Sequence, residues 1–274
     1  MKRIIWLTLL GATVISLAFS ACGGAVQPTA TTEPTQAPKP TQAPEPTATS
    51  LPIFTVAMDA TWPPFESVNE STKEIEGFDV DLIKAVAEKG GFQVELVNVP
   101  WDPLLAGMAT CQYDAAASAM TITEERKEGF AFSDPYFAAG QIVTVRNDNT
   151  DITGKDTLTG KTVGAQLGTT GAIEAEKMEG VTLKNYDDIG LAFQDLMNGQ
   201  IDAVIADNPL ALGYVTKNSD KLKVVGEVFT DEAYGIAVCK NKTELLAMIN
   251  KGLAAVKAEG ILNQLADKWG LTVK

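Results

Sequence analysis

Residues 115–137 read AAASAMTITEERKEGFAFSDPYF and give the clearest indication of the fold. The first six residues are small or apolar without alternation, which is typical of a strand buried on both faces of a parallel sheet. Thr123 then suits a helix N-cap, and Glu124 and Glu125 suit the first helical turn. The pattern predicts a strand, a short turn and a helix, with the turn at the carboxyl end of a sheet, where open α/β folds bind ligands.

Arg126 follows the predicted cap by three residues. The unpaired N–H groups of a helix N-terminus attract anions, and a guanidinium can hold a carboxylate through two parallel hydrogen bonds. The combination predicts a carboxylate-binding site. The alternative is a solvated arginine that pairs with a nearby glutamate.

Composition narrows the class of protein. The 274 residues provide for one large domain or two of ordinary size, and 45% are hydrophobic, enough for globular cores. A net charge of −13 argues against nucleic acid and against electrostatic docking on anionic lipid. The chain has no histidine and three cysteines without ligand spacing, so we expect no metal and no cofactor.

The first 52 residues are predicted to be a targeting segment and a tether. Residues 1–22 form a signal peptide, with a basic start at Lys2 and Arg3 and an apolar run over 4–19 that is too short for a good membrane span. The sequence FSAC at 19–22 resembles a bacterial lipobox, in which Cys22 is lipidated; the alternative is an ordinary signal peptide cut near Ala21. Either way we expect an exported protein, anchored to the outer face of the cell membrane or periplasmic. Residues 23–52 are rich in Pro and Thr and predict a disordered tether.

The folded part is predicted over 53–274 as two α/β series. The first is a βαβαβ series, which indicates a parallel sheet with covering helices; it comprises strands 53–58, 92–99 and 115–120 and helices 79–89 and 102–110. The second comprises strands 141–146, 161–166, 181–186, 201–206 and 221–225 with helices between them, then strand 234–238 and helices 243–258 and 261–269. Two similar halves favour two lobes with a cleft between them.

Six motifs resemble the family 3 extracellular solute-binding proteins, the polar amino-acid receptors of ABC importers. They are VAMDATWPPFE at 56–66, GFDVDL at 77–82, MTITEERKEGFAFSDPYF at 120–137, GKTVGAQLGTTG at 160–171, QIDAVIADNPLA at 200–211 and AYGIAV at 233–238. The resemblance implies an α/β, two-lobed periplasmic-binding-protein fold of type II, each lobe a mixed sheet flanked by helices. Lobe 1 would be 53–136 and 235–274 and lobe 2 141–230, joined by hinge strands near 137–140 and 231–234. It also implies a monomeric binding protein, not an enzyme, that closes over its ligand and delivers it to the permease subunits.

The resemblance assigns the ligand's α-carboxylate and α-ammonium to particular residues. Arg126 would clamp the carboxylate, with the Thr121 hydroxyl beside it. The carbonyl of Ala119 and the carboxylate of Asp207 would accept from the ammonium. The alternative for Asp207 is a helix N-cap, because Pro209 suits the first helical turn.

The resemblance also assigns the rest of the binding site. Backbone N–H groups of loop 167–171 would touch the carboxylate, with Thr169 and Thr170 most exposed to it; the alternative is a mere turn. Two indoles would sandwich the ligand side chain, although buried tryptophans are common in cores. The two indoles are those of Trp62 and Trp101. Asp59, on the rim of lobe 1, could accept from the ligand side chain, and Gln166 lies where relatives vary their side-chain contact.

Arginine is the first choice of ligand, because two indole faces, an acid and a neutral Gln166 suit a flat cation. Glutamine is second, with lysine, histidine or ornithine behind. One alternative is a dehydratase acting on a cyclohexadienyl acid, as a few proteins of this fold are; it needs a spare general acid, and Asp59 and Asp207 are the only cleft acids identified. Another is a ligand-sensing receptor component.

The resemblance further implies a disulfide between Cys111 and Cys239. In the family fold, strand 234–238 runs antiparallel beside strand 115–120, so the residue before one strand approaches the residue after the other. Export favours a disulfide. The alternative is two free cysteines, one of them a small buried hydrophobic residue.

Overall fold

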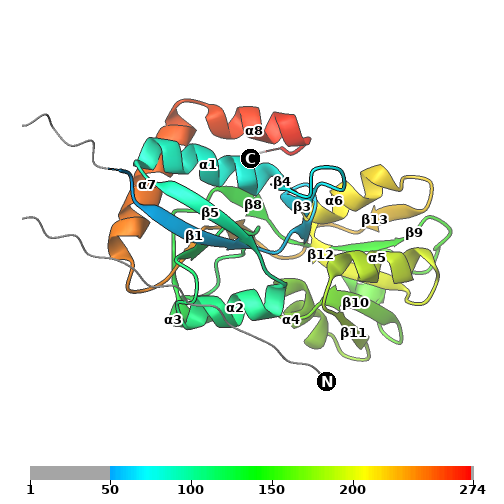
Figure 1. Cartoon of the computed structure of the whole chain (residues 1–274). Helices are drawn as coiled ribbons and strands as arrows, with labels where there is room; N and C mark the ends of the chain where they lie inside the picture. Colours follow the sequence, from blue (N-terminus) through cyan, green and yellow to red (C-terminus); the bar gives the residue numbers. More distant parts are fainter. Residues whose placement is uncertain (1–49, 273–274) are drawn as a thin grey trace, which may run out of the picture. The chain divides into compact units, whose positions relative to one another are not determined.

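The structure, a computed structural model of the chain, describes residues 50–272, which form two α/β lobes (Figure 1). Each lobe has a five-stranded sheet, in the order β5-β1-β6-β15-β7 in the first lobe and β11-β10-β12-β9-β13 in the second. The predicted signal peptide, the predicted lipidation site at Cys22 and all but the last three residues of the predicted tether lie outside the described residues. Within the described part, no helix has the length and apolar character needed to cross a membrane.

The first lobe is built on a mixed sheet between two layers of helices. Its strands β1 (Ile53–Met58), β5 (Gln93–Asn98), β6 (Ala115–Ala116) and β7 (Ala131–Phe132) run in one direction, and β15 (Ala237–Val238) runs antiparallel to its neighbours β6 and β7. The helices are α1 (Phe78–Gly90), α7 (Thr243–Ala258) and α8 (Ile261–Trp269) on one face and α2 (Trp101–Ala109) and α3 (Glu124–Gly129) on the other. Successive side chains of β1 point to opposite faces of the sheet, so this strand contributes to a hydrophobic core on each face. Val56 and Met58 pack toward α1, and Ala57 packs toward α2.

Two strands of this lobe differ from the sequence prediction. The strand predicted over 115–120 ends at Ala116, because the chain turns at Ala119, which has a left-handed φ of 43°. The strand predicted over 234–238 is divided into β14 (Glu232–Tyr234) and β15, since the Gly235 N–H donates to the carbonyl of Met120 and the chain crosses from one sheet to another. Four very short strands, too short for a periodic pattern, were not predicted: β7 and the strands β2 (Thr61–Trp62), β3 (Glu66–Val68) and β4 (Ile75–Glu76).

The second lobe repeats the arrangement with a continuous stretch of chain. Its strands are β9 (Gln141–Arg146), β10 (Thr162–Gln166), β11 (Thr182–Tyr186), β12 (Ala203–Asp207) and β13 (Leu222–Val225). Strands β10, β11 and β12 are parallel, and β9 runs antiparallel to β12 and β13. A 3₁₀ turn, Lys155–Thr157, and three helices, α4 (Thr170–Glu176), α5 (Ile189–Met197) and α6 (Asn208–Lys217), complete the lobe.

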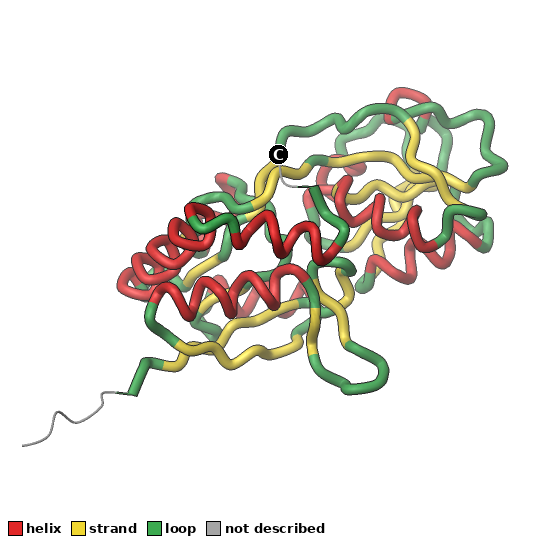
Figure 2. The backbone as a smooth tube through the Cα atoms, turned by 90° about the horizontal axis from the view of Figure 1, so that it is seen from above, coloured by secondary structure: helices red, strands yellow, loops and turns green. Residues whose placement is uncertain are grey.

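A two-stranded ribbon connects the lobes. Strand β8 (Phe137–Ala139) pairs antiparallel with β14, with Phe137 opposite Tyr234 and Ala139 opposite Glu232. Figure 2 shows the two lobes side by side. Because only two neighbouring strands make this connection, the lobes can rotate as bodies about it.

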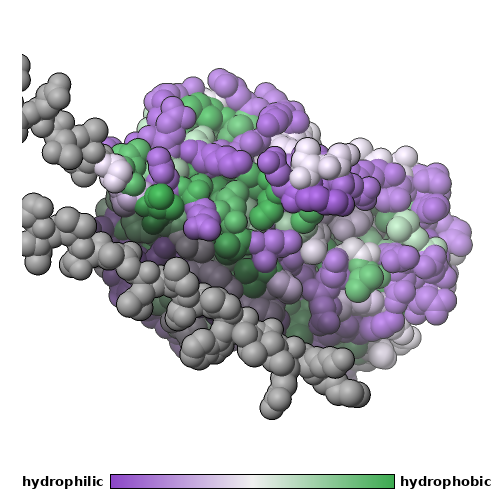
Figure 3. Space-filling view, viewed as in Figure 1, coloured by the Kyte–Doolittle hydropathy of each residue, from purple (hydrophilic) through white to green (hydrophobic). Residues whose placement is uncertain are grey.

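Figure 3 shows hydrophilic side chains over most of one face of the molecule, while apolar side chains gather over the α1, β1 and β5 side of the first lobe. Leu51 and Ile53, which are 48% and 63% exposed, belong to this side, where the described chain begins. A disulfide at the amino end of the parallel strands of the same sheet joins Cys111, just before β6, to Cys239, just after β15. This is the pairing that the resemblance implied.

Candidate functional site

A small cavity lies between the lobes where the carboxyl ends of β6 and β12 meet the helix α3. Its volume of about 10 Å³ leaves room for at most one water molecule. All the predicted ligand residues line it except Asp59 and Gln166, which bond to each other beside Trp62. The complete lining is Trp62, Trp101, Ser118, Ala119, Thr121, Arg126, Thr169, Thr170 and Asp207.

Arg126 spans the cavity from the third residue of α3. Thr123 caps this helix as predicted, since its hydroxyl accepts from the Arg126 N–H at 3.1 Å. The guanidinium donates to the carbonyl of Thr121 at 2.8 Å and, across to the second lobe, to the carbonyl of Gly168 at 3.1 Å. It also lies 5.1 Å above the ring of Trp101. Burial lowers the pKa of Arg126 and the charge of Asp207 opposes this, so the side chain remains a cation between the lobes.

Asp207 ends β12 on the opposite lobe and is buried. It occupies the N-cap position of α6, but its side chain makes no capping bond. Instead its carboxylate accepts from the Gln141 amide at 2.8 Å and from the Tyr234 hydroxyl at 2.7 Å. Burial, with a further contribution from the charge of Glu232, raises the pKa of Asp207 to about 6. The site therefore holds a cation from one lobe and a titratable acid from the other.

Glu232, on the connecting strand β14, is a functional candidate that sequence reasoning missed. Its carboxylate accepts from the hydroxyl of Thr121 in the first lobe and that of Thr170 in the second, both at 2.9 Å. It also accepts from Thr230 at 2.7 Å and from the amide of Gln141. Nothing near Glu232 in the sequence distinguishes it from an exposed loop acid, because its partners come from three distant segments.

A second network lies at the side-chain end of the site. Asp59 accepts from the Gln166 amide and from the Thr61 hydroxyl, both at 2.9 Å, and Gln166 accepts from the indole N–H of Trp62. Asp59, which was expected on the rim of lobe 1, faces the other lobe, where Gln166 covers it and leaves it 1% exposed. Burial raises the pKa of Asp59, and its hydrogen bonds oppose that rise.

The Thr169 hydroxyl serves the backbone of its own loop. It donates to the carbonyl of Gln166 at 2.7 Å and accepts from the Ala172 N–H as the cap of α4. The Thr170 hydroxyl donates to Glu232, so both hydroxyls bond within the protein, and the contact of the loop's backbone N–H groups with a ligand carboxylate stays a prediction. Thr169 nevertheless lines the cavity, at the N-terminal end of α4.

The two predicted indoles face each other across the cavity. The rings of Trp62 and Trp101 are stacked with centroids 6.4 Å apart and planes inclined by 27°. A flat group between the two rings needs about 3.5 Å on each side, or ring planes about 7 Å apart. A small increase in the distance between the indoles would therefore admit one. The indole N–H of Trp101 is buried without a partner.

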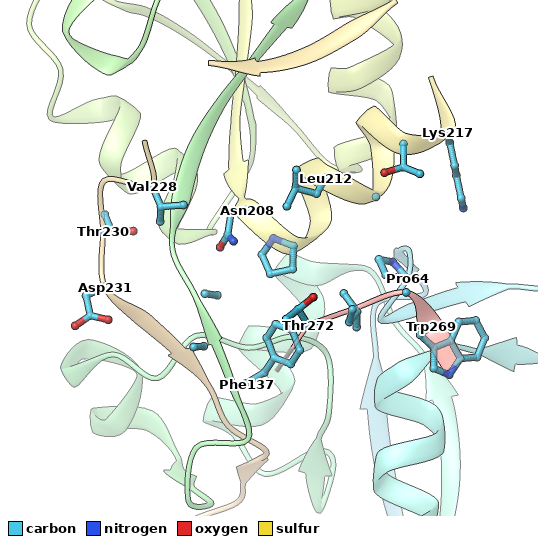
Figure 4. A pocket seen from close by; sticks show the side chains of 17 residues that line it. Pro64, Phe137, Asn208, Leu212, Lys217, Val228, Thr230, Asp231, Trp269 and Thr272 are labelled. Carbon is cyan, nitrogen blue, oxygen red and sulfur yellow. The ribbon is translucent and has the colours of Figure 1, made fainter. Parts of the chain in front are cut away.

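A larger cavity of about 600 Å³ lies beside the connecting strands (Figure 4). It contains none of the predicted ligand residues. Its wall includes Phe137, Pro209, Leu212 and Trp269, from the connection, α6 and α8. Size alone would favour this cavity as the ligand site, but the convergence of charged and aromatic side chains favours the smaller one.

Residues 54–272 match the model of a family described as bacterial extracellular solute-binding proteins, family 3. The chain belongs to this family. The resemblance seen in the six motifs is therefore confirmed. Members of this family are described as extracellular, so the chain belongs to a family of exported proteins.

Relatives of this family 3 protein bind different amino acids. The L-cystine-binding protein TcyJ of Escherichia coli K12 is 34% identical over 216 residues, covering 78% of this chain and 81% of the relative. ABC transporter arginine-binding protein 1 of E. coli K12 is 36% identical over 219 residues, covering 77% and 88%. The crystal structure of a mutant of ArgBP from T. maritima is 43% identical with a TM-score of 0.75, covering 79% and 94%. The two-lobed α/β fold predicted from the sequence is confirmed, and the function class is that of an amino-acid-binding component of an ABC transporter.

Proposed function

We propose that this protein captures a polar L-amino acid between its lobes, arginine first and glutamine second, and delivers it to the permease of an ABC importer. The observation that carries the proposal is the convergence of Arg126 and Asp207, from different lobes, on one cavity. A zwitterion has a carboxylate for the first and an ammonium for the second. Bound to both, it would hold the lobes together.

The main-chain end of the ligand would take over contacts that the lobes now make with each other. The carboxylate would accept from the guanidinium of Arg126, which now donates to the carbonyl of Gly168, and from Thr121 and Thr170, which now donate to Glu232. Bidentate arginine–carboxylate bonds are roughly twice as strong as neutral ones, so the exchange favours the ligand. The ammonium would donate to Asp207 and to the carbonyl of Ala119.

The side-chain end favours a planar cation. A guanidinium fits between the stacked indoles of Trp62 and Trp101 once they separate slightly, and cation–π attraction rewards it there. Asp59 and Gln166 supply acceptors at the edge of the sandwich. Glutamine would use the same acceptors through a neutral amide, without the cation–π contribution. Two of the three relatives named above bind arginine, which supports the same order.

Calorimetry against the standard amino acids tests the proposal. The protein is first unfolded and refolded to remove bound ligand. We expect arginine to bind at micromolar concentration or tighter, about −8 kcal/mol, and glutamine more weakly. If no amino acid binds in this range, the proposal is refuted. If another amino acid binds most tightly, the class stands and the choice of arginine fails.

Affinity should fall as the pH is lowered through about 6. The ammonium pairs with ionised Asp207, whose pKa in the free protein is raised to about 6 by burial and by Glu232. A bound cation lowers the pKa of Asp207, so binding releases a proton below pH 6. The Kd should therefore rise by up to about tenfold for each unit of acidification below that pH. Titrations between pH 7.5 and 4.5 measure this slope. Asp207→Asn should bind weakly at every pH, and an unchanged wild-type Kd down to pH 4.5 would contradict the assignment.

The alternative function is the dehydratase named from the sequence. Glu232 is a third acid at the cleft, beside Asp59 and Asp207, so a candidate general acid is present after all. Its carboxylate, however, already accepts hydrogen bonds from Thr121, Gln141, Thr170 and Thr230, so its oxygens are held by protein groups and are not presented to a substrate. Incubation with prephenate or arogenate tests this, because aromatic absorbance appears only if the protein dehydrates them.

The lipid anchor remains a sequence prediction. We expect the wild-type protein, a monomer, to fractionate with membranes through lipidated Cys22, and Cys22→Ser to be exported in soluble form. The tether over 23–52 would let the binding domain turn above the membrane. Fractionation of both proteins, with mass analysis of the wild-type N-terminus, checks this. Recovery of the wild type entirely in the soluble fraction would favour the ordinary signal peptide.

A further inference from the structure

Two buried acids lie behind the candidate site, and the binding mechanism above uses neither. Glu66 begins β3 and Asp79 is the second residue of α1, and both side chains are 0% exposed. The Asp79 N–H donates to the carbonyl of Phe65 at 2.9 Å, which brings the two acids together. Gly77 permits this approach, since a Cβ there would lie 2.0 Å from the same carbonyl oxygen.

Each acid has one satisfied oxygen and one unsatisfied oxygen. Glu66 Oε1 accepts from the Ser118 hydroxyl at 2.7 Å, and Asp79 Oδ2 accepts from the Ala119 N–H and the Tyr136 hydroxyl, both at 2.6 Å. Glu66 Oε2 and Asp79 Oδ1 are buried and have no partner. Among the ion pairs of residues 50–272, none involves either acid.

Two ionised carboxylates are not stable in this position. Burial penalises both charges, and each charge repels the other. Burial raises the pKa of both carboxyls above the usual range, and the charge of Asp79 raises that of Glu66 further. The other titratable groups facing the pair are Asp59 and Tyr136, and neither supplies a positive charge. One proton between the two unsatisfied oxygens would remove one charge and supply both missing hydrogen bonds.

We propose that Glu66 and Asp79 share one proton, and that this protonated pair is a positioning device for the amino-acid site. The pair holds the turn at Ser118 and Ala119, both of which line the cavity. Ala119 adopts a left-handed conformation that L side chains rarely take, and its bond to Asp79 stabilises it there. Ser118 in turn accepts from the Asp59 N–H at 2.9 Å.

The pair therefore reaches two residues that the proposed function assigns to the ligand, Ala119 and Asp59. Neither Glu66 nor Asp79 lines the cavity, so both act through the turn and not by contact. This inference rests on the proposed function for its effect on affinity. The shared proton itself rests only on the buried oxygens and their partners.

Infrared difference spectroscopy on the ligand-free protein tests the proton. A protonated carboxyl has a C=O stretch that shifts in D₂O and is distinct from that of a carboxylate. Near pH 7, the spectrum of wild type minus Glu66→Gln should contain this band, and so should wild type minus Asp79→Asn, because an amide N–H replaces the shared proton in each variant. Subtraction cancels other acids such as Asp207. If neither difference spectrum contains the band, the shared proton is refuted.

The affinity for arginine tests the positioning role. Each single amide keeps one donor facing one acceptor and should stay within about threefold of wild type, whereas Glu66→Ala and the double variant Glu66→Gln/Asp79→Asn should each lose about tenfold or more. In the double variant two NH₂ groups face each other without an acceptor. If both acids were ionised instead, amides would relieve repulsion and the double variant would bind as well as wild type, which would overturn the proposal.

Two controls separate the possible failures. Glu88→Gln, an exposed acid of the same helix α1, should leave affinity unchanged. Melting temperatures of all the variants show whether a loss of binding is a loss of folding; single amides that melt well below the wild type also contradict the pair. A wild type that binds no amino acid refutes the proposed function and with it the positioning role, and the spectra alone then decide the shared proton.

Discussion

Arg126→Ala should abolish amino-acid binding at micromolar concentration. The guanidinium is the cation that would receive the ligand carboxylate in a nearly water-free cavity, and no other arginine or lysine lines that cavity. Leaving one member of a buried charge pair without its partner costs about 3–5 kcal/mol, which corresponds to about a hundredfold or more in Kd. Calorimetry with arginine measures the loss directly.

Two matched variants make the result specific. Arg126→Lys keeps the charge but not the planar fork, so affinity should fall to an intermediate value. Arg146→Ala removes an arginine that donates to the carbonyls of Leu196 and Ile201 within the second lobe. It should lower stability and leave Kd unchanged. Binding by Arg126→Ala within tenfold of wild type would refute the assignment of the carboxylate.

Removal of the disulfide with Cys111→Ala/Cys239→Ala should lower the free energy of unfolding more than any other substitution proposed above. The bond joins residues 128 positions apart, and the chain-entropy model predicts a loss of about 4–5 kcal/mol in the free energy of unfolding for a loop of this length. Denaturant unfolding of the oxidised wild type and the variant measures the difference. A loss below about 1 kcal/mol would show that the unfolded chain is already restricted without the bond.

Ligand affinity is the control for this second prediction. Both cysteines belong to the first lobe and lie at the end of its sheet away from the cavity. The double variant should therefore bind arginine with wild-type Kd at temperatures where it is folded. Thiol counting under denaturing, non-reducing conditions adds a direct check. Free thiols at both Cys111 and Cys239, counted separately from Cys22, would contradict the bond.

Local signals in the sequence predicted much of the fold. The boundaries of α7 and α8 agree with the predicted helices at 243–258 and 261–269, and Thr123 caps α3 as expected. These features depend on residues within a few positions of one another. The end of β6 was missed because the left-handed turn at Ala119 depends on the hydrogen bond that the Ala119 N–H donates to Asp79, forty residues away.

The same distinction applies to the candidate site. Arg126 was recognised from its own helix, whereas the ligand role of Asp207 was assigned by the family resemblance. The network of Gln141, Glu232 and Tyr234 was not predicted, because these residues gain their partners only when the connecting strands bring the lobes together. The burial of Asp59 likewise comes from Gln166 in the other lobe. Sequence reasoning identified side chains that a strand end or a helix presents, and missed those that tertiary contacts orient.

The order of strands has a consequence for how the protein reaches its native state. The second lobe takes all five of its strands from 141–225, whereas the first lobe must pair β6, at Ala115–Ala116, with β15, at Ala237–Val238. Closing that long loop is entropically more costly than the pairings inside the second lobe. The second lobe should thus fold first and act as an already ordered spacer, which shortens the search of the C-terminal strand for its place. Folding of the first lobe then becomes the slow step after export.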